Sequence, residues 1–147
     1  MEEKKLLFAL VVLSCVCACT GQTLPPMPQD AINITADPVI ESQNAETGDV
    51  VIQYTLFLEN VSDTTLETVI LKDFKAPNEI VMEKGYFTIT NLRPGETNPV
   101  VFRVIVEGWG LNPRDQTWEV GFTIRIEENG SYMEEDVFYY QIHLYPE

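Results

Sequence analysis

The sequence predicts an all-β domain folded as an antiparallel sandwich of seven or eight strands. The first observation is that apolar and polar residues alternate with a period of two after residue 30, without the wider spacing of an apolar helix stripe. The second is that turn-forming residues separate these runs at short intervals. The third is length, because 147 residues leave room for one domain once an export segment is removed.

Each strand is placed by its own alternation. In residues 118–126, for example, every second residue is large and apolar. The predicted strands lie near 31–41, 49–59, 66–74, 79–83, 86–92, 99–107, 116–127 and 132–145. The main turns between them fall at 47–49, 60–64, 93–96, 108–114 and 128–131. One buried and one wet face per strand is typical of antiparallel sheets, and this number of short strands favours a two-sheet sandwich of immunoglobulin type.

The last hairpin allows two registers. Its Asn129-Gly130 pair favours a two-residue loop, which would set the apolar residues of the last strand opposite the polar face of its neighbour. A three-residue loop of residues 128–130, with Gly130 left-handed in a bulge, shifts the register by one and brings both apolar sets to one core. We therefore predict the three-residue loop. The expected cross-strand pairs are Val120 with Phe138 and Trp118 with Tyr140.

The N-terminal residues resemble an export signal. Residues 6–19 form an apolar run of 14 residues. A bilayer-spanning helix needs about 20 residues, whereas a signal peptide needs about 7–15. The run ends in Val16-Cys17-Ala18-Cys19, which resembles the lipobox of prokaryotic lipoproteins. That resemblance implies a lipid on Cys19, which becomes the new N-terminus.

The predicted organisation has three parts. A signal peptide over 1–18 precedes a Pro-rich tether over 19–30 and a β-sandwich domain over 31–147. Three alternatives stay open: lipidation of Cys15 instead of Cys19, an ordinary secretory signal cut near Ala18, or an uncleaved anchor. Each of them places the domain outside the cytoplasm.

Composition excludes several classes of function. Nine Lys and Arg against 23 Asp and Glu give a net charge of −14, which argues against nucleic acid as a partner. All three cysteines precede residue 20, and His143 is the one histidine. The domain therefore lacks the residues for a Cys–His catalytic pair or a transition-metal site. We predict no enzymatic activity, no metal and no cofactor.

Two segments carry a family resemblance. Residues 47–73 contain Gly48-Asp49 followed by Val-Val-Ile-Gln-Tyr-Thr, and residues 89–97 contain Leu92-Arg-Pro-Gly-Glu96 before the next strand. Together they resemble the immunoglobulin-like modules of prokaryotic surface proteins, namely the DUF11-type repeat and the related CARDB and FxLYD domains. The resemblance covers roughly residues 47–107. Its motifs are structural, since the glycines and the proline supply turns.

Two sets of residues are candidate sites. The three N-glycosylation sequons begin at Asn33, Asn60 and Asn129. The aromatic residues Trp109, Tyr132, Tyr139 and Tyr145 are candidates for a platform that stacks on a sugar or a partner. For Trp109 the alternative is that it folds over the end of the sandwich and closes the core.

These observations predict a lipid-anchored, non-catalytic module on the outer face of the cytoplasmic membrane, with a role in binding or adhesion. Its expected partners are the membrane, through the lipid, and either another envelope protein or a surface polysaccharide. One alternative is an accessory subunit of a membrane transport or secretion complex. The other is a small secreted hydrolase, for which no nucleophile–base pair stands out.

Overall fold

The computed structural model of the chain describes residues 28–146, except for the side chains of residues 136–140. A short helix, α1 (Pro28–Ala31), leads into eight strands, and a turn of 3-10 helix, η1 (Trp109–Leu111), lies between the sixth and the seventh. The strands are β1 (Ile32–Gln43), β2 (Val50–Asn60), β3 (Leu66–Lys75), β4 (Ile80–Met82), β5 (Phe87–Leu92), β6 (Thr97–Val106), β7 (Gln116–Glu128) and β8 (Ser131–Leu144). All eight predicted strands are present, with boundaries that differ by two residues at most.

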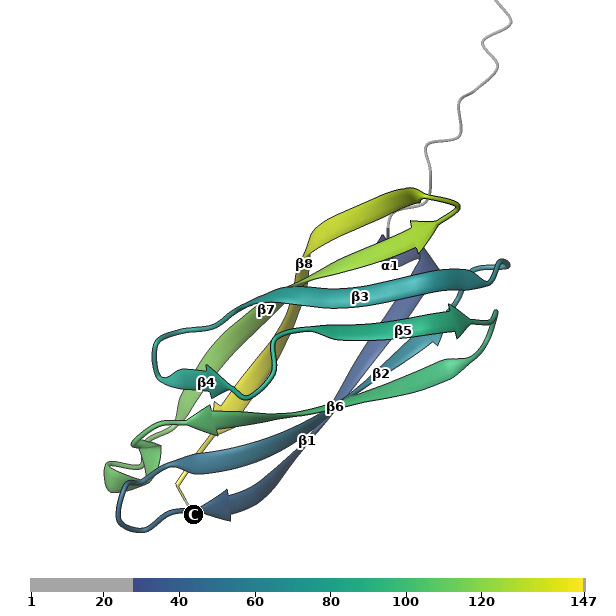
Figure 1. The fold of residues 1–147 in the computed structure, drawn as a ribbon. Coiled ribbons are helices and arrows are strands. Elements are labelled where there is room, and N and C mark those ends of the chain that lie inside the picture. Colours follow the sequence, from purple (N-terminus) through teal and green to yellow (C-terminus); the bar gives the residue numbers. More distant parts are fainter. Residues whose placement is uncertain (1–27, 147) are drawn as a thin grey trace, which may run out of the picture.

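The strands form two four-stranded antiparallel sheets that pack against each other (Figure 1). Sheet A has the order β1-β2-β6-β4, and sheet B has the order β5-β3-β7-β8. The predicted antiparallel β-sandwich is therefore confirmed. Among residues 28–146, no helix is long and apolar enough to cross a membrane.

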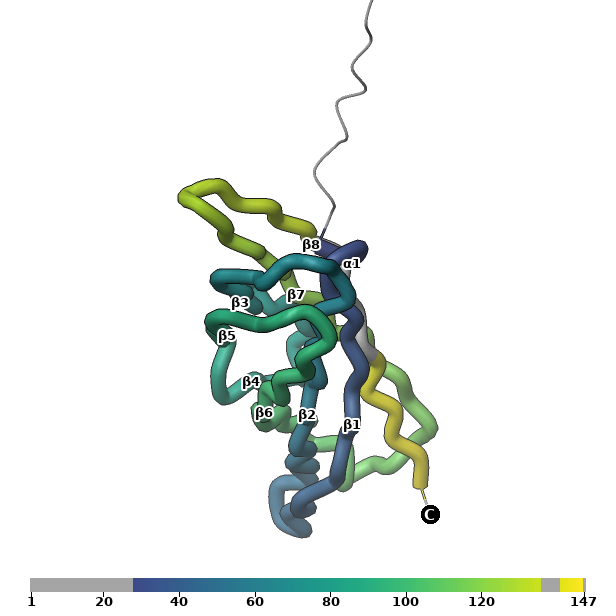
Figure 2. The backbone as a smooth tube through the Cα atoms, turned by 90° about the vertical axis from the view of Figure 1, so that its right-hand side faces the viewer, coloured from purple at the N-terminus to yellow at the C-terminus, as the bar shows by residue number. Residues whose placement is uncertain are grey.

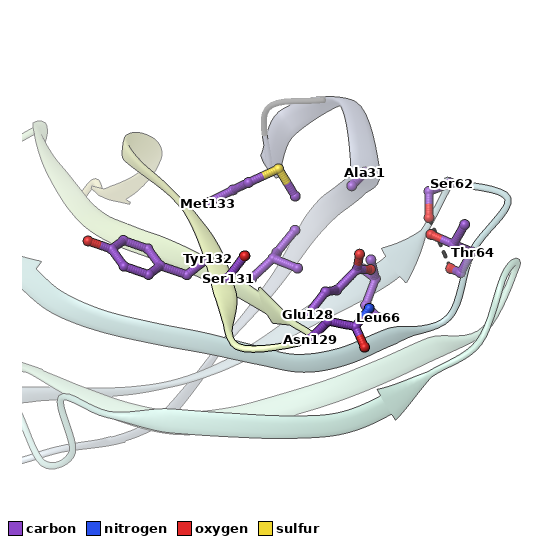
Figure 3. A pocket seen from close by; sticks show the side chains of 10 residues that line it. Ala31, Ser62, Thr64, Leu66, Glu128, Asn129, Ser131, Tyr132 and Met133 are labelled. Atoms are coloured by element: carbon purple, nitrogen blue, oxygen red, sulfur yellow. Dashed lines mark hydrogen bonds between the residues drawn. The ribbon is translucent and has the colours of Figure 1, made fainter. Parts of the chain in front are cut away.

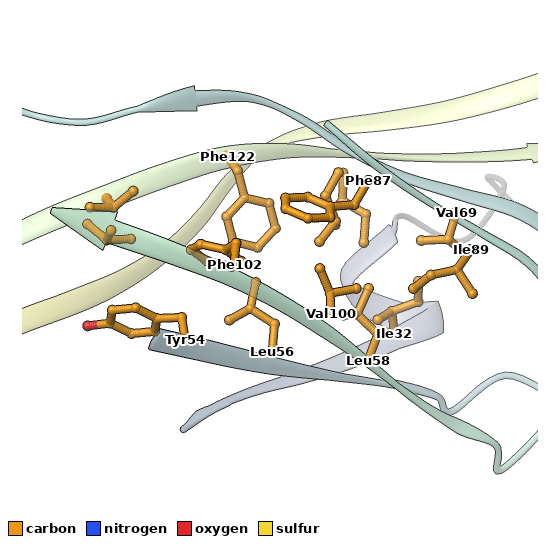
Figure 4. Packing of buried hydrophobic residues seen from close by; sticks show 14 of the residues in the cluster. Ile32, Tyr54, Leu56, Leu58, Val69, Phe87, Ile89, Val100, Phe102 and Phe122 are labelled. Atoms are coloured by element: carbon orange, nitrogen blue, oxygen red, sulfur yellow. The ribbon is translucent and has the colours of Figure 1, made fainter. Parts of the chain in front are cut away.

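The core lies between the sheets and is filled from alternate positions of each strand (Figure 4). In β2, the five apolar residues from Val50 to Leu58 at even positions are at most 3% exposed. Aromatic rings occupy the middle of the core. The ring of Phe74 lies 5.3 Å from that of Phe122 and 5.7 Å from that of Phe102, measured between centroids. This burial follows directly from the alternation in the sequence.

The predicted register of the last hairpin is wrong. Glu128 pairs with Ser131, so the loop has two residues, Asn129 and Gly130, with φ of 50° and 76°. Positive φ at both positions is the geometry that matches the twist of a two-residue hairpin. The apolar faces are aligned further along, by an irregularity between Phe122 and Ile124 that inserts one extra residue into β8. Beyond it the observed pairs are Trp118 with Ile142 and Val120 with Tyr140.

The two ends of the sandwich differ. The chain enters at α1, which contacts β7 and β8 near their hairpin, while the C-terminal end lies beside the β1–β2 turn at the other end (Figure 1). In Figure 2, turned by 90°, the yellow end of β8 starts close to β1 and diverges from it toward the C-terminal end. Here the hydroxyl of Tyr54 in β2 donates to the carbonyl oxygen of Gln141 in β8, at 3.3 Å, and ties the two sheets together on their open side.

Candidate binding site

A groove lies between β1 and the end of β8, on the open side of the sandwich and far from α1. Its volume is about 360 Å³. We call it the edge groove, and its lining residues are Ile40, Gln43, Val50, Trp109, Pro113, His143, Leu144, Tyr145 and Pro146. Leu144 forms its buried floor, whereas Ile40 and Tyr145 are 61% and 66% exposed. Large apolar side chains that stay exposed beside an apolar floor are typical of a binding surface.

The edge groove exists because β1 extends beyond the part of sheet A that sheet B covers. Ala36, Pro38 and Ile40 of β1 pair with Leu56, Tyr54 and Ile52 of β2. Those three β2 residues are at most 3% exposed, which shows that this face points inward. The three β1 residues on the same face are all exposed. Sheet B therefore leaves the second half of β1 uncovered.

Trp109 closes one end of the edge groove. It begins η1 after Gly108, whose φ is 69°, and its half-buried indole packs against the core. Its indole N–H donates to the carbonyl oxygen of Arg114 at 2.9 Å, within the same loop. Trp109 thus takes the position expected of a residue that closes the sandwich, and it also lines the groove with Tyr145.

Two glycines hold the Trp109 loop against the β1–β2 turn. The amide of Gly110 donates to the carbonyl oxygen of Gly48 at 2.7 Å. A Cβ on Gly110 would collide with Gln43 Nε2 and lie 3.0 Å from that carbonyl oxygen, and a Cβ on Gly48 would lie 2.6 Å from Leu111. The amide of Gly108 also donates to Asp49 Oδ1 at 2.9 Å. The Gly48-Asp49 turn, recognised in the sequence as a family-like motif, therefore positions one wall of the edge groove.

A bidentate ion pair fixes the end of β1. The register between β1 and β2 shifts at Glu41, whose carboxylate accepts two hydrogen bonds from Arg103 of β6, at 2.6 and 2.9 Å. The hydrogen bond from Arg103 holds the pKa of Glu41 below its usual value. Because both side chains are exposed, the pair fixes position more than it adds stability.

His143 and Asp115 form a polar pair at the rim of the edge groove. His143 Nε2 lies 2.7 Å from Asp115 Oδ1, and the imidazole lies 5.7 Å from the ring of Tyr145 between centroids. A His–Asp pair is part of many hydrolytic sites, but such a site also needs a nucleophile next to the imidazole. The residues that line the edge groove include no Ser, Thr or Cys.

The predicted aromatic platform does not form as one surface. Tyr132 lies at the start of β8, and Tyr145 lies 13 residues later, which is about 40 Å at the usual rise per residue of a strand. The ring of Tyr132 is covered by the guanidinium of Arg125, whose Cζ lies 3.8 Å from the ring centroid. Tyr139 pairs with Gly121 of β7, and its side chain is outside the described part of the structure. Of the four predicted residues, only Trp109 and Tyr145 line the same groove.

A second pocket, of about 500 Å³, lies under α1 at the opposite end of the sandwich (Figure 3). Ala31 of α1, the β2–β3 turn and the β7–β8 hairpin form its walls, and Leu66 and Ile126 lie at its base. The phenol of Tyr132 points away from the other labelled side chains in Figure 3. This pocket adjoins the point where the chain enters the domain, so we place the candidate site in the edge groove.

The three sequons differ in accessibility. Asn33 in β1 and Asn129 in the last hairpin are exposed. Asn60 is fully buried, and its amide nitrogen donates to the carbonyl oxygens of Thr64 and Leu92 at 2.8 and 2.9 Å. A glycan on Asn60 would break both bonds and open the core, so the folded domain offers only Asn33 and Asn129. Burial of Asn60 is a tertiary effect that the sequon itself does not encode.

The predicted anchor and tether lie outside the described residues. Cys19, the alternative Cys15 and the tether up to residue 27 lie outside the described part of the chain. Within residues 28–146, no group of three or more His, Cys, Asp or Glu side chains is placed to hold a metal ion. Sequence reasoning missed Ile40, and the one available signal was an apolar residue on an edge strand next to a turn.

Two antiparallel four-stranded sheets around one core, with a groove beside the free edge of β8, define an immunoglobulin-like β-sandwich with a candidate binding surface. No protein-family model and no curated protein matches the sequence. Solved structures do match the fold. The ApaA protein from Bordetella pertussis is 15% identical, with 81% of this chain and 98% of that chain covered and a TM-score of 0.50.

Two further structures are similar. A protein from Arabidopsis thaliana solved in solution is 13% identical, with 85% of this chain and 88% of that chain covered and a TM-score of 0.50. A FixG-related protein from Vibrio parahaemolyticus is 18% identical, with 78% of this chain and 97% of that chain covered and a TM-score of 0.46. At these identities the similarity shows the fold alone. The resemblance to surface-protein modules is thus supported at the level of the immunoglobulin-like sandwich.

Proposed function

We propose that this protein is a lipid-anchored, non-catalytic binding or adhesion module on the outer face of the cytoplasmic membrane. The observation that carries the proposal is that the predicted anchor and the edge groove lie at opposite ends of the domain. The lipobox-like sequence and the Pro-rich segment precede α1 at one end, and the edge groove lies at the other end. A tether from Cys19 would therefore present the groove away from the membrane, toward another envelope protein or a surface polysaccharide.

The anchor is tested by the intact mass of the protein purified from membranes of its own host. We expect a chain that begins at Cys19 and carries the mass of a lipid. Cys19→Ala should release the protein from the membrane fraction, whereas the matched change Cys15→Ala should not. An unlipidated chain found in the medium would refute the anchor, and release by Cys15→Ala alone would assign the lipid to the other cysteine.

Glycosylation of the exposed sequons is a further part of this proposal. Asn33 and Asn129 are accessible, and Asn60 is buried. In a host that modifies surface proteins, the intact mass should show hexose-sized increments that decrease when Asn33 or Asn129 is replaced by Gln. A glycopeptide that contains Asn60 would contradict the assignment.

A specific observation favours a second candidate, an accessory subunit of a membrane complex. The outer face of sheet A carries four exposed apolar side chains, whereas outward faces of antiparallel sheets are ordinarily polar. They are Val39, Phe57, Val81 and Val101, which are 37–53% exposed. A partner subunit that covered this face would bury them.

This candidate is tested by the size of the assembly extracted from membranes in mild detergent. Val101→Glu on the outer face of sheet A should release the protein from a larger complex. Thr88→Glu, an exposed position on β5 of sheet B, provides the control with the same added charge. If wild type and both variants migrate as the single chain, the protein is not an accessory subunit.

A further inference from the structure

The edge groove has the geometry of a site for an extra β-strand, and this inference rests on the proposed binding function. β8 is the last strand of sheet B, so one side of its backbone has no neighbouring strand within residues 28–146. Near α1 this side is approached by the helix, where the amide of Gln29 lies 3.3 Å from Glu135 Oε2. In the middle, the carbonyl oxygen of Gln141 accepts the hydroxyl of Tyr54. The remaining stretch, residues 142–146, lies along the edge groove.

The backbone of this stretch can pair with an incoming chain. Backbone groups of an antiparallel edge strand point alternately to the paired side and to the free side. Tyr54 reaches the Gln141 carbonyl from the other sheet, so that carbonyl lies on the free side. By the same alternation, the backbone groups of His143, two residues further on in β8, point to that side. An edge strand with unpaired groups next to an apolar groove is a template for strand addition.

The opposite wall of the groove is β1, which has an inward-facing apolar side chain that an added strand would bury. Ile40 is 61% exposed, although it shares the inward face of sheet A with the buried Ile52. A strand placed beside β8 would extend sheet B by one position, over the uncovered half of β1. Every second side chain of that strand would point inward, onto Ile40 and Leu144, and the others would point outward.

Charge selects the kind of strand. The chain carries −14, and the carboxylate of Asp115 lies at the groove beside His143. Glu46, in the exposed β1–β2 turn next to Gln43, adds a second carboxylate at this end. An acidic strand or a second copy of this chain would be repelled, whereas basic side chains on the outward face would be attracted.

We propose that the edge groove binds an extended segment of another envelope protein, with alternating apolar and basic residues, by adding it as a fifth strand to sheet B. The partner's apolar side chains cover Ile40 and Leu144, and its backbone bonds with β8 at His143. Tyr145 and Trp109 flank the segment as aromatic contacts.

The test uses the full chain reconstituted in phosphatidylcholine vesicles and a labelled peptide, acetyl-(Val-Lys)4-amide. We expect saturable binding that weakens as salt is raised, together with slower hydrogen exchange at the His143 amide. The same peptide with alternate backbone nitrogens methylated cannot complete the strand ladder and should not bind. Acetyl-(Val-Glu)4-amide should not bind either, because of its charge.

Matched variants locate the site. Ile40→Ser should weaken peptide binding about tenfold, since it removes an apolar side chain that the peptide buries. Val61→Ser, at a valine that is 51% exposed in the β2–β3 turn at the opposite end of the domain, should leave binding unchanged. Both positions are exposed, so both variants keep the fold.

Several outcomes would overturn the inference. They are equal binding of the methylated peptide, loss of peptide binding by Val61→Ser, or no detectable peptide binding by a protein that does bind a neutral surface polysaccharide. The proposed function is tested separately, by the lipid mass and by protease cleavage of the domain on intact cells. If the protein is lipidated and surface-exposed but does not bind the peptide, strand addition is refuted and the proposed function stands. If the protein binds the peptide but is retained in the cytoplasm, the proposed function is refuted and strand addition stands.

Discussion

Asn60 is fully buried at the end of β2, where its side chain joins the β2–β3 turn to the end of β5. Besides its bonds to Thr64 and Leu92, its Oδ1 accepts the amide and the hydroxyl of Ser62 at 2.9 and 2.6 Å. Its own backbone pairs with Gly95 and Glu96 in the β5–β6 turn. A buried amide with all its groups bonded holds a structure together, because each lost partner would leave another polar group unsatisfied.

Asn60→Ala should lower the free energy of unfolding by about 3 kcal/mol, because the buried carbonyl of Leu92 loses its donor. Urea denaturation followed by tryptophan fluorescence measures the change. Asn33→Ala is the matched control, since the exposed amide of Asn33 has only a 3.4 Å contact with Glu59. Similar losses for both variants would show that the buried network contributes little.

Tyr54 makes stability depend on pH in the alkaline range. Burial raises the pKa of its phenol from 10.0 to about 12. In the unfolded chain the phenol loses its proton at lower pH than in the folded one, so its contribution is complete below pH 10 and is lost as pH rises toward 12. Unfolding free energies from urea titrations across this interval should therefore fall more steeply for the wild type than for Tyr54→Phe. Parallel pH profiles for the two proteins would contradict this assignment.

At the level of elements, the β7–β8 hairpin depends on a left-handed residue. Gly130 has φ of 76°, and a Cβ there meets no atom within 4 Å, so a substitution acts through the backbone alone. Gly130→Ala should cost about 1 kcal/mol of unfolding free energy, measured by thermal denaturation. Gly85→Ala is the control, because that site is equally open and has no positive φ. Equal melting temperatures for the two variants would rule out backbone strain at the turn.

The same hairpin shows how far the sequence leads. Alternation places all eight strands and the inward residues of β2, β6 and β7, because each pattern is local to one strand. It fails on the register of β8, where the extra residue lies well past the turn. The prediction has one register from the loop onward, whereas the structure has one register from the loop to Ile124 and another from Phe122 onward. Nothing in residues 134–138 distinguishes a bulge from a regular strand.

The edge groove was only partly predictable for a related reason. Trp109 and Tyr145 stand out in the sequence as aromatic residues in a loop and near a chain end. Their meeting with Ile40 depends on where sheet B stops relative to β1, which follows from sheet twist and packing. Single-strand patterns carry no information on that relation, so Tyr132 and Tyr145 were grouped although the structure separates them.

For the whole molecule, the dominant property is its net charge of −14. Charges of one sign repel one another more in the compact state than in the unfolded chain, and salt screens this repulsion. Raising NaCl from about 20 mM to about 300 mM at pH 7 should therefore raise the urea midpoint. Near the isoelectric point of about 4.3 the same addition should have little effect, and this is the control. An equal salt effect at both pH values would mean that repulsion is not its cause.

The opposite placement of α1 and the edge groove has a mechanical consequence. A partner held in the groove of an anchored molecule would pull on the last residues of β8, while the tether would pull on the first residue of β1. That tension runs along the strands, and the hydrogen bonds between antiparallel strands lie across them. The force therefore shears many bonds together instead of peeling them apart singly. In that arrangement the domain would resist stretching between the membrane and the partner.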